Sequence, residues 1–316
     1  MSQTTTSMIA EALARMLEDC KPASDGFDAR LWRTVAEAGV PRLLRPENEG
    51  GAGESAWPDA LEVLQTWAQS GADIPLADTL LAHRLLAQVG VDPGESIAIV
   101  LQIAGPDGAP DPVQPPIAQA GVKILEVSPW GVQASGRLRA ADGTTTALQW
   151  PDAARVRAEL AATAAAVITG AMRQAFALTL SYTGTRVQFG KAISQFQAVQ
   201  HALALAAEEI AASRATLDWS GADLVEPGCW PSAFMAKARA ADAAGKVAAI
   251  THQAHGAIGF TAEYALFRST RLLWSWRERW GDEQHWNAEL GRAALSQGPD
   301  ALFDLVIGEA PLVSRC

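Results

Sequence analysis

The sequence predicts a mainly α-helical protein in three parts: an N-terminal helical domain, a shortened central β segment and a C-terminal four-helix bundle. Three observations predict this arrangement. Apolar residues recur every three or four positions toward both ends of the chain, which is the spacing of helices. Short β-type runs interrupt that pattern near the middle. The long helical segments after the interruption are joined by short turns, as in antiparallel bundles.

The N-terminal helical domain is predicted to span residues 1–94. Helical spacing is clear in the stretches MIAEALARML, DALEVLQTWA and LADTLLAHRLLAQVG. The loop RPENEGGAGES lies after the first of them, and its glycines permit positive φ and close backbone approach. We therefore expect packed helices separated by one irregular, glycine-rich loop.

The central part, residues 95–150, has a different texture. The stretches SIAIVLQIAG, GVKILEVSPWGVQASG and TTTALQW are β-type runs separated by Gly, Pro and Asp. This length of chain is enough for only a few strands of ordinary length.

The C-terminal part, residues 151–316, is rich in alanine. We predict helices near 152–184, 191–219, 231–257, 262–280 and 284–297, and a short one after Pro299. Pro231 suits a helix start, because the missing N–H costs nothing in the first turn. Gly170 lies in AELAATAAAVITGA, where the small side chains predict a close helix crossing.

Composition excludes several classes of function. The chain has 25 Lys and Arg against 35 Asp and Glu, a net charge of −10, which argues against nucleic acid or an anionic membrane as a partner. No run is long enough to span a membrane, and the N-terminus lacks the features of a signal peptide, so we expect a cytoplasmic protein. The scattered cysteines and histidines predict neither a disulfide framework nor a metal site. The cysteines are Cys20, Cys229 and Cys316.

The stretch SYTGTRVQFGKAISQFQAVQ contains the first candidate binding corner. One helix is predicted to end near Arg186, and Gly190 lets the chain turn into the next. A guanidinium at this position suits a phosphate or pyrophosphate, because its fixed donors match anionic oxygens. The alternative is an ordinary C-terminal helix charge, worth a few tenths of a kcal/mol. Phe189 is the unusual residue, since Asn-Gly would turn the chain equally well.

The stretch THQAHGAIGFTAEYALFR contains the second corner. Gln253, Gly256 and Gly259 lie where one helix is predicted to end and another to begin. Exposed backbone amides at a glycine-rich corner can bind phosphate oxygens or the edge of a nucleotide. The alternative is a helix C-cap. His255, inside this corner, is a candidate hydrogen-bonding group for a nucleotide or a partner.

Together these motifs resemble the acyl-CoA dehydrogenase family. RVQFGKAISQFQAVQ is similar to that family's Arg-x-x-Phe-Gly-Lys corner, and QAHGAIGFTAEY to its Gln-x-x-Gly-Gly-x-Gly corner, with Ala257 replacing the second glycine. RPENEGGAGES resembles its N-terminal Pro-Glu-x-x-Gly-Gly-x-Gly loop. The resemblance implies the same three-part fold, with FAD as cofactor.

The resemblance also implies roles for individual residues. In this family the arginine and phenylalanine of the first corner reach across a subunit interface to the neighbour's FAD. Carried over, Arg186 would contact the pyrophosphate and Phe189 the adenine side. The other residues implied at this pocket are Gln188, Ile193, Phe196, Gln197, Gln253, Gly256 and Ala257.

The sequence departs from the family at the catalytic base. The family's carboxylate removes an α-proton while the β-hydride moves to flavin. The commonest position of that carboxylate falls here on Trp280, and a second family position falls on Leu160. Glu159 adjoins the latter, but one residue is a rotation of about 100° on a helix, so it is expected to point elsewhere. Glu159 remains the candidate for a displaced base; Glu278 and Asp282 are expected to be solvated charges.

Two further features depart from a self-contained enzyme. The central β segment is short and carries none of the family's motifs for the flavin ring and acyl-CoA. The tryptophans near the C-terminus are so dense that we expect a protein interface or a plugged pocket. They are Trp274, Trp276, Trp280 and Trp286.

These observations lead to one hypothesis and three alternatives. The chain is interpreted as the non-catalytic subunit of a heteromeric (α2β2) acyl-CoA dehydrogenase of the steroid-catabolism type. A full-length acyl-CoA dehydrogenase-like partner would bind the acyl-CoA and supply the base, and the two chains would share FAD. The first alternative is a self-sufficient enzyme using Glu159, and the second is a flavin-free scaffold subunit. The third is a relative with other flavin chemistry, such as a monooxygenase.

Overall fold

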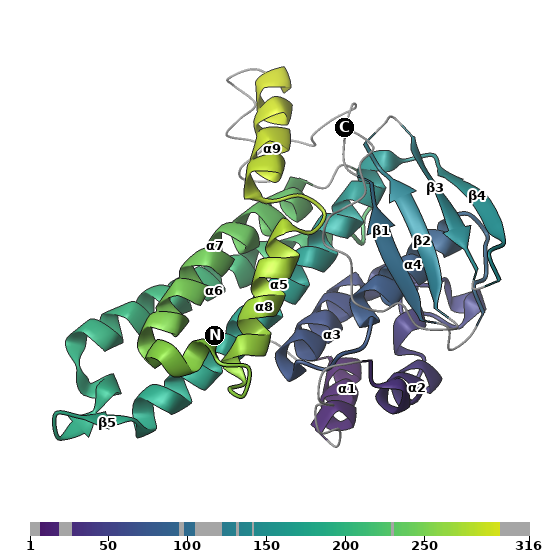
Figure 1. Cartoon of the computed structure of the whole chain (residues 1–316). Helices are drawn as coiled ribbons and strands as arrows, with labels where there is room; N and C mark the ends of the chain where they lie inside the picture. The colour runs from purple at the N-terminus through teal and green to yellow at the C-terminus, as the bar shows by residue number, and fades with distance from the viewer. Residues whose placement is uncertain are drawn as a thin grey trace.

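The structure is a computed structural model that describes residues 7–18, 27–94, 98–104, 122–130, 133–140, 142–228 and 231–297. Its mainly helical fold confirms the predicted fold class. Figure 1 shows N-terminal helices beside a small sheet, and a long bundle of helices that extends away from both. The predicted helix after Pro299 and the three cysteines lie outside the described residues.

Within residues 7–18 and 27–94, four helices and three short 3₁₀ turns form the N-terminal part. The carboxylate of Asp28 caps the second helix by accepting hydrogen bonds from the N–H groups of Arg30 and Leu31. The helices are α1 (Met8–Glu18), α2 (Ala29–Glu37), α3 (Trp57–Ser70) and α4 (Leu76–Gln88). The 3₁₀ turns are η1 (Val40–Arg42), η2 (Glu47–Glu49) and η3 (Glu54–Ala56), and the glycine-rich loop runs through the last two.

The central sheet has its strands in sequence order, with the first pair parallel and the other two pairs antiparallel. The strands are β1 (Ile99–Ile103), β2 (Lys123–Ser128), β3 (Ala134–Arg139) and β4 (Thr145–Trp150). Trp150 fixes the sheet to the N-terminal helices, because its indole N–H donates to the carbonyl of Leu85 on α4 at 2.7 Å.

The outer edge of β1 is closed by side chains. Both backbone groups of Ile99 bond the hydroxyl of Thr79 at 3.0 Å, and the N–H of Leu101 donates to Asp78 at 3.0 Å. An open strand edge is a template for further pairing. Helix α4 therefore ends the sheet at β1 by satisfying the backbone groups that another strand would bind.

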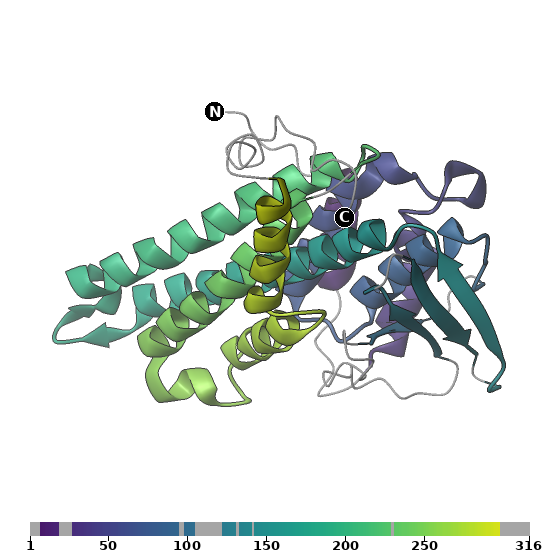
Figure 2. The same ribbon diagram turned by 90° about the horizontal axis from the view of Figure 1, so that it is seen from above.

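The C-terminal part is a bundle of antiparallel helices, with a last helix that extends from its side (Figures 1 and 2). The helices are α5 (Ala153–Thr185), α6 (Gln197–Asp223), α7 (Pro231–His255), α8 (Leu266–Glu278) and α9 (Glu283–Gln297). The prediction that the second of these begins at 191 is wrong. Residues 187–192 form a hairpin of β5 (Val187–Gln188) and β6 (Lys191–Ala192), and the 3₁₀ turn η4 (Ile193–Gln195) precedes the helix.

Helix α5 is the central helix of the molecule. A Cβ added to Gly170 would lie 2.4 Å from the carbonyl oxygen of Gln65 on α3, so only glycine permits this crossing. The close crossing predicted from the small residues is therefore present, and α3 is the helix it meets. Among the described residues, α5 is the one helix long and apolar enough to cross a membrane, but 78% of its apolar window is buried inside the protein. It is a core helix of this fold.

Candidate functional site

The first corner is a tight hairpin between α5 and α6. The N–H of Arg186 donates to the carbonyl of Tyr182 at 2.8 Å, and its carbonyl accepts from Ile193 at 2.9 Å. Both turn residues, Phe189 and Gly190, have positive φ, at 51° and 81°. This is the pattern of a type I′ turn, which normally favours Asn-Gly. The backbone of Arg186 is thus fixed on both sides while its side chain is exposed.

Phe189 is strained and exposed at the same time. A left-handed conformation costs roughly 1–2 kcal/mol for a residue with a Cβ atom, and 91% of this side chain is in contact with solvent. Its ring lies edge-on to Phe196, with the centroids 6.1 Å apart, and the Nζ atom of Lys191 lies 4.3 Å from the centroid of Phe196. A strained turn residue with a ring this exposed points to a function outside the chain.

The other residues predicted at the first corner follow the hairpin. Ile193 and Phe196 are half-buried in the turn η4 and at the start of α6. Gln188 and Gln197 are exposed, as is Arg186, for which the described residues provide no ion-pair partner. The corner therefore presents two exposed cations, Arg186 and Lys191, together with two amides and an aromatic ring.

The second corner is the 3₁₀ turn η5 (Gly256–Phe260), which joins α7 to the segment before α8. Gly256 has φ 66°, the left-handed value that ends the helix, and this fits a C-cap as well as a binding corner. Gln253, Gly256 and Ala257 are all exposed. The corner thus leaves backbone and amide groups open to a ligand.

The two corners lie at the same end of the bundle (Figure 2). Tyr182 from the last turn but one of α5 stacks on His255 at the end of α7, with ring centroids 4.4 Å apart. Large exposed apolar side chains gather on the elements around them. They are Leu180, Val187, Phe189, Leu205, Ile258 and Phe260.

The usual position of the base is filled by a buried tryptophan. Trp280 is 3% exposed and has φ 61°, and the guanidinium of Arg279 lies against the edge-to-face pair of Trp276 and Trp280, 4.5 and 4.6 Å from their rings. Arg279 makes a bidentate pair with Asp78, with one bond at 3.0 Å, and donates to the carbonyl of Leu101 at 3.0 Å. A buried ion pair packed against two aromatic rings therefore occupies this place, and its Asp78 carboxylate is engaged on both oxygens.

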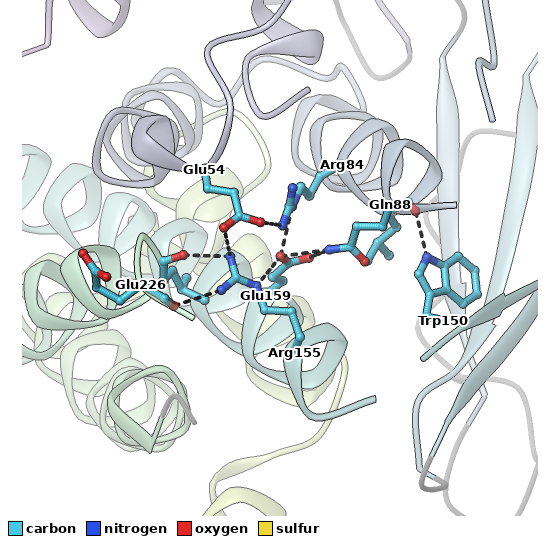
Figure 3. Close-up of polar contacts among 9 residues, drawn as sticks. Glu54, Arg84, Gln88, Trp150, Arg155, Glu159 and Glu226 are labelled. Atoms are coloured by element: carbon cyan, nitrogen blue, oxygen red, sulfur yellow. Dashed lines mark hydrogen bonds and ion pairs between the residues drawn. The ribbon is translucent and has the colours of Figure 1, made fainter. Parts of the chain in front are cut away.

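Glu159 is engaged in a second buried network, shown in Figure 3. Its carboxylate accepts hydrogen bonds from Arg155 Nε at 2.7 Å, Arg84 Nε at 3.0 Å and Gln88 Nε2 at 3.1 Å, and the side chain is fully buried. Leu160, the second family position for a base, is buried in the core. The carboxylate of Glu159 is turned toward Arg155 and Arg84.

The network around Glu159 ties four segments together. Arg84 from α4 also pairs with Glu54 of η3 at 2.5 Å. Arg155 from the first turn of α5 donates to the carbonyls of Leu224 at 2.7 Å and of Glu226 at 3.5 Å, beyond the end of α6. The glycine-rich loop, α4, α5 and the end of α6 therefore meet at one carboxylate, which gives Glu159 a structural task.

Two other predictions concern α8 and the segment that follows it. The C-terminal tryptophans were expected to mark a protein interface or a plugged pocket, and this chain buries three of the four. Trp276, Trp280 and Trp286 are at most 3% exposed within this chain, whereas Trp274 is 46% exposed. Their indoles pack on Arg279 and on Phe234, so the plugged-pocket interpretation fits and the interface is not needed for them.

The carboxylates beside Trp280 have ordinary roles. Glu278 is exposed at the end of α8. Asp282 accepts a hydrogen bond from the N–H of His285 at 2.8 Å and so caps α9. The described residues contain no group of three His, Cys, Asp or Glu side chains that could hold a metal ion.

Sequence reasoning missed the partners of these buried charges. Asp78 and Arg279 are 201 positions apart, and no local pattern reveals such a pair. Arg155 and Glu159 did carry a signal, because an arginine and a glutamate four residues apart share one helix face. An ionic pair on an otherwise apolar helix indicates a buried network.

The three-part fold with both corners at one end of the bundle defines a class of mainly helical proteins with a small central sheet. It resembles the steroid ACAD Tcur3481-Tcur3483 (G363A variant) with a TM-score of 0.75 and 23% identity, over 92% of this chain and 97% of that one. It also resembles the ChsE4-ChsE5 complex of Mycobacterium tuberculosis, with a TM-score of 0.71 and 19% identity, over 94% of this chain and 100% of that one.

Sequence relatives identify the family within that class. Residues 154–276 match the model of the acyl-CoA dehydrogenase C-terminal domain. The acyl-CoA dehydrogenase IpdE2 of Mycolicibacterium smegmatis is 31% identical over 254 residues, which cover 76% of this chain and 79% of the relative. The chain belongs to the acyl-CoA dehydrogenase family, which generally uses FAD.

Proposed function

We propose that this chain is the non-catalytic subunit of a heteromeric, FAD-dependent acyl-CoA dehydrogenase. It would complete the FAD site of a full-length acyl-CoA dehydrogenase-like partner, in an α2β2 assembly. The observation that carries the proposal is an asymmetry. The corners that face a neighbour's cofactor are exposed and open, whereas the position of the chain's own base is filled by buried Trp280.

The exposed corners fit the diphosphate and adenine portions of FAD. Arg186 offers an exposed guanidinium, and a guanidinium can bind two oxygens of one phosphate. Gly256 and Ala257 are exposed at the end of α7, and Gln253 adds an exposed amide. Phe189 offers a flat apolar ring on which an adenine can lie. These residues bind and orient; none of them moves a proton.

The catalytic groups are assigned to the partner. Bound FAD supplies the acceptor for the β-hydride of an acyl-CoA whose α-proton is taken by a carboxylate. In this chain the Trp280 ring, the Arg279–Asp78 pair and the network of Glu159 leave no open carboxylate at either family position. The partner would therefore hold the base, the flavin ring and the CoA thioester.

The substrate class is proposed from relatives. One similar structure is described as a steroid ACAD, and another is a two-protein complex. We infer a CoA thioester derived from a steroid as the substrate of the assembled enzyme, which would work in the cytoplasm. The self-sufficient alternative is not favoured, because Glu159 is buried and bound by three donors.

The experiment compares this chain alone with the same chain co-expressed with a full-length acyl-CoA dehydrogenase-like subunit encoded by a neighbouring gene. Flavin absorbance and native mass are measured for both. We expect no bound flavin on the chain alone and a yellow heteromer with FAD in the complex. A chain that is yellow and oxidises acyl-CoA by itself would overturn the proposal.

A matched pair of variants then tests the corner itself. Arg186→Ala in the complex is expected to weaken FAD binding, while Arg33→Ala, an exposed arginine on α2, leaves it unchanged. If Arg186→Ala retains both flavin content and turnover, the corners are only packing and the flavin-free scaffold is the better description.

A further inference from the structure

A cluster of three rings joins the two corners inside the bundle end. His255, the last residue of α7, stacks on Tyr182 of α5 with centroids 4.4 Å apart and lies 5.1 Å from the ring of Tyr264, which precedes α8. Arg186 follows Tyr182 by one helical turn, and Gly256 directly follows His255. The second corner therefore begins directly after His255, and the first corner begins one helical turn after Tyr182, the residue that stacks on His255.

Hydrogen bonds fix the state of this histidine. Its Nδ1 lies 2.8 Å from the carbonyl of Thr251, which can only accept, so Nδ1 carries the proton. In the neutral ring Nε2 is then the acceptor for the hydroxyl of Tyr264, at 3.2 Å. The hydroxyl of Tyr182 lies 3.5 Å from the carbonyl of His255 and completes the link to α5. Burial lowers the pKa of His255, which favours this neutral form.

The glycines of the second corner allow its backbone to pack closely against this histidine. A Cβ added to Gly259 would lie 3.0 Å from the Cβ of His255 and 3.1 Å from Leu266. Gly256 supplies the left-handed φ that starts the turn. The position of the η5 backbone therefore depends on the placement of His255, which in turn is held by Tyr182 and Tyr264.

We propose that His255 is a positioning residue that holds the two corners in register for the FAD of the heteromer. The inference rests on the proposed function, since it concerns the same cofactor. His255 is 5% exposed, so it acts through Gly256 and Ala257 on one side and through Tyr182 and Arg186 on the other. The cofactor itself touches the corners, not the imidazole.

The test measures the FAD dissociation constant of the apo-complex, by titration of flavin fluorescence, together with its melting temperature. Tyr264→Phe removes only the hydroxyl that donates to His255 and keeps the ring. We expect FAD binding to weaken about fivefold, the effect of one lost hydrogen bond. The control Thr179→Val removes a buried hydroxyl that bonds only within α5, and is expected to leave FAD binding unchanged.

A second pair of variants separates positioning from general stability. His255→Phe keeps a ring against Tyr182 but loses both hydrogen bonds, so FAD binding should weaken more than in Tyr264→Phe. His255→Gln can place an amide oxygen near the former Nε2, and should recover part of the affinity when Tyr264 is present but none in the Tyr264→Phe background. A purely structural residue would lower the melting temperature without this dependence.

The outcomes distinguish this inference from the proposed function. If Arg186→Ala weakens FAD binding while Tyr264→Phe and His255→Gln do not, the positioning role is refuted and the shared cofactor site stands. If Arg186→Ala also has no effect, both fall together. Where His255→Phe fails to assemble, Tyr264→Phe alone decides, because it changes a single oxygen atom.

Discussion

Arg155 Nε donates a hydrogen bond of 2.7 Å to the carboxylate of Glu159, one helical turn further along α5. Both side chains are buried, and Arg84 and Gln88 from α4 approach the same carboxylate. A free base needs a lone pair directed at its substrate, and here the donors occupy the oxygens. The relationship makes Glu159 the centre of a structural network between the N-terminal helices and the bundle.

Glu159→Gln is predicted to reduce stability and not chemistry. The change leaves Arg84 and Arg155 buried with less compensating charge, which costs about 3–5 kcal/mol when a buried pair is broken. Thermal unfolding should shift to lower temperature, while the turnover number of the assembled heteromer is retained. Glu208→Gln, an exposed glutamate on α6, is the control. A loss of turnover of a hundredfold or more at unchanged melting temperature would instead identify Glu159 as the base.

The Asp78–Arg279 pair is predicted to behave as one unit. Asp78→Asn and Arg279→Met each leave the other charge uncompensated, at a cost of about 3–5 kcal/mol. The double variant should cost less than the sum of the two, because neither charge remains. Denaturant unfolding of the four proteins measures the coupling. Additive effects would mean that the bonds to β1 and the rings on Arg279 matter more than the pair.

The corners could be predicted from sequence because their chemistry is local. Arg186, Phe189 and Gly190 are neighbours in the chain, and the geometry they adopt depends on the two turn residues. The start of α6 at 197 was missed, although the same Phe-Gly pair contains the signal. Two successive residues with positive φ form the turn of a hairpin. The second strand of that hairpin contains Lys191 and Ala192, which the helical pattern had assigned to the helix.

The buried charges could not be predicted, because they depend on contacts between distant segments. Asp78 closes the edge of β1 from α4, and Arg279 reaches the same strand from the end of α8. The choice between an interface and a plugged pocket for the tryptophans could not be made from the sequence for the same reason. Their density is visible in the sequence, but their packing against Arg279 is visible only in the folded chain. The roles of the corner residues toward FAD remain predictions.

Acid is predicted to destabilise this chain through His83. Burial, and after it the charge of Arg45, lowers the pKa of this histidine to about 4 from an ordinary value of 6.5. The unfolded chain therefore binds a proton that the folded chain does not, and stability is lost as the pH falls from 6.5 toward 4. The difference corresponds to ~3 kcal/mol at the lower end.

The measurement is the melting temperature between pH 7 and 4.5, for the wild type and for His83→Gln. The variant should show a smaller fall across this range, since glutamine does not titrate. Some dependence remains, because burial also lowers the pKa values of His255 and His285. His201→Gln, at an exposed site on α6, should behave like the wild type. An unchanged slope in His83→Gln would contradict the assignment.

Phe189→Asn is predicted to stabilise the isolated chain and to weaken FAD binding by the assembled heteromer. Asn-Gly is the preferred pair for a type I′ turn, so the change relieves about 1 kcal/mol of backbone strain at φ 51°. The same change removes an aromatic ring that is 91% exposed in this chain and is proposed to lie against the cofactor of the partner. The melting temperature of the chain alone should therefore rise, while the heteromer binds FAD less tightly.

Leu295→Asn is the matched control, because Leu295 is an equally exposed apolar side chain on α9, which is separate from the two corners. It should leave FAD binding unchanged. If Phe189→Asn raises the stability of the chain and the heteromer binds FAD as before, the strain at this turn has another cause. If the heteromer of Phe189→Asn binds FAD less tightly, the phenylalanine is retained because its contact with the cofactor outweighs the cost of its conformation.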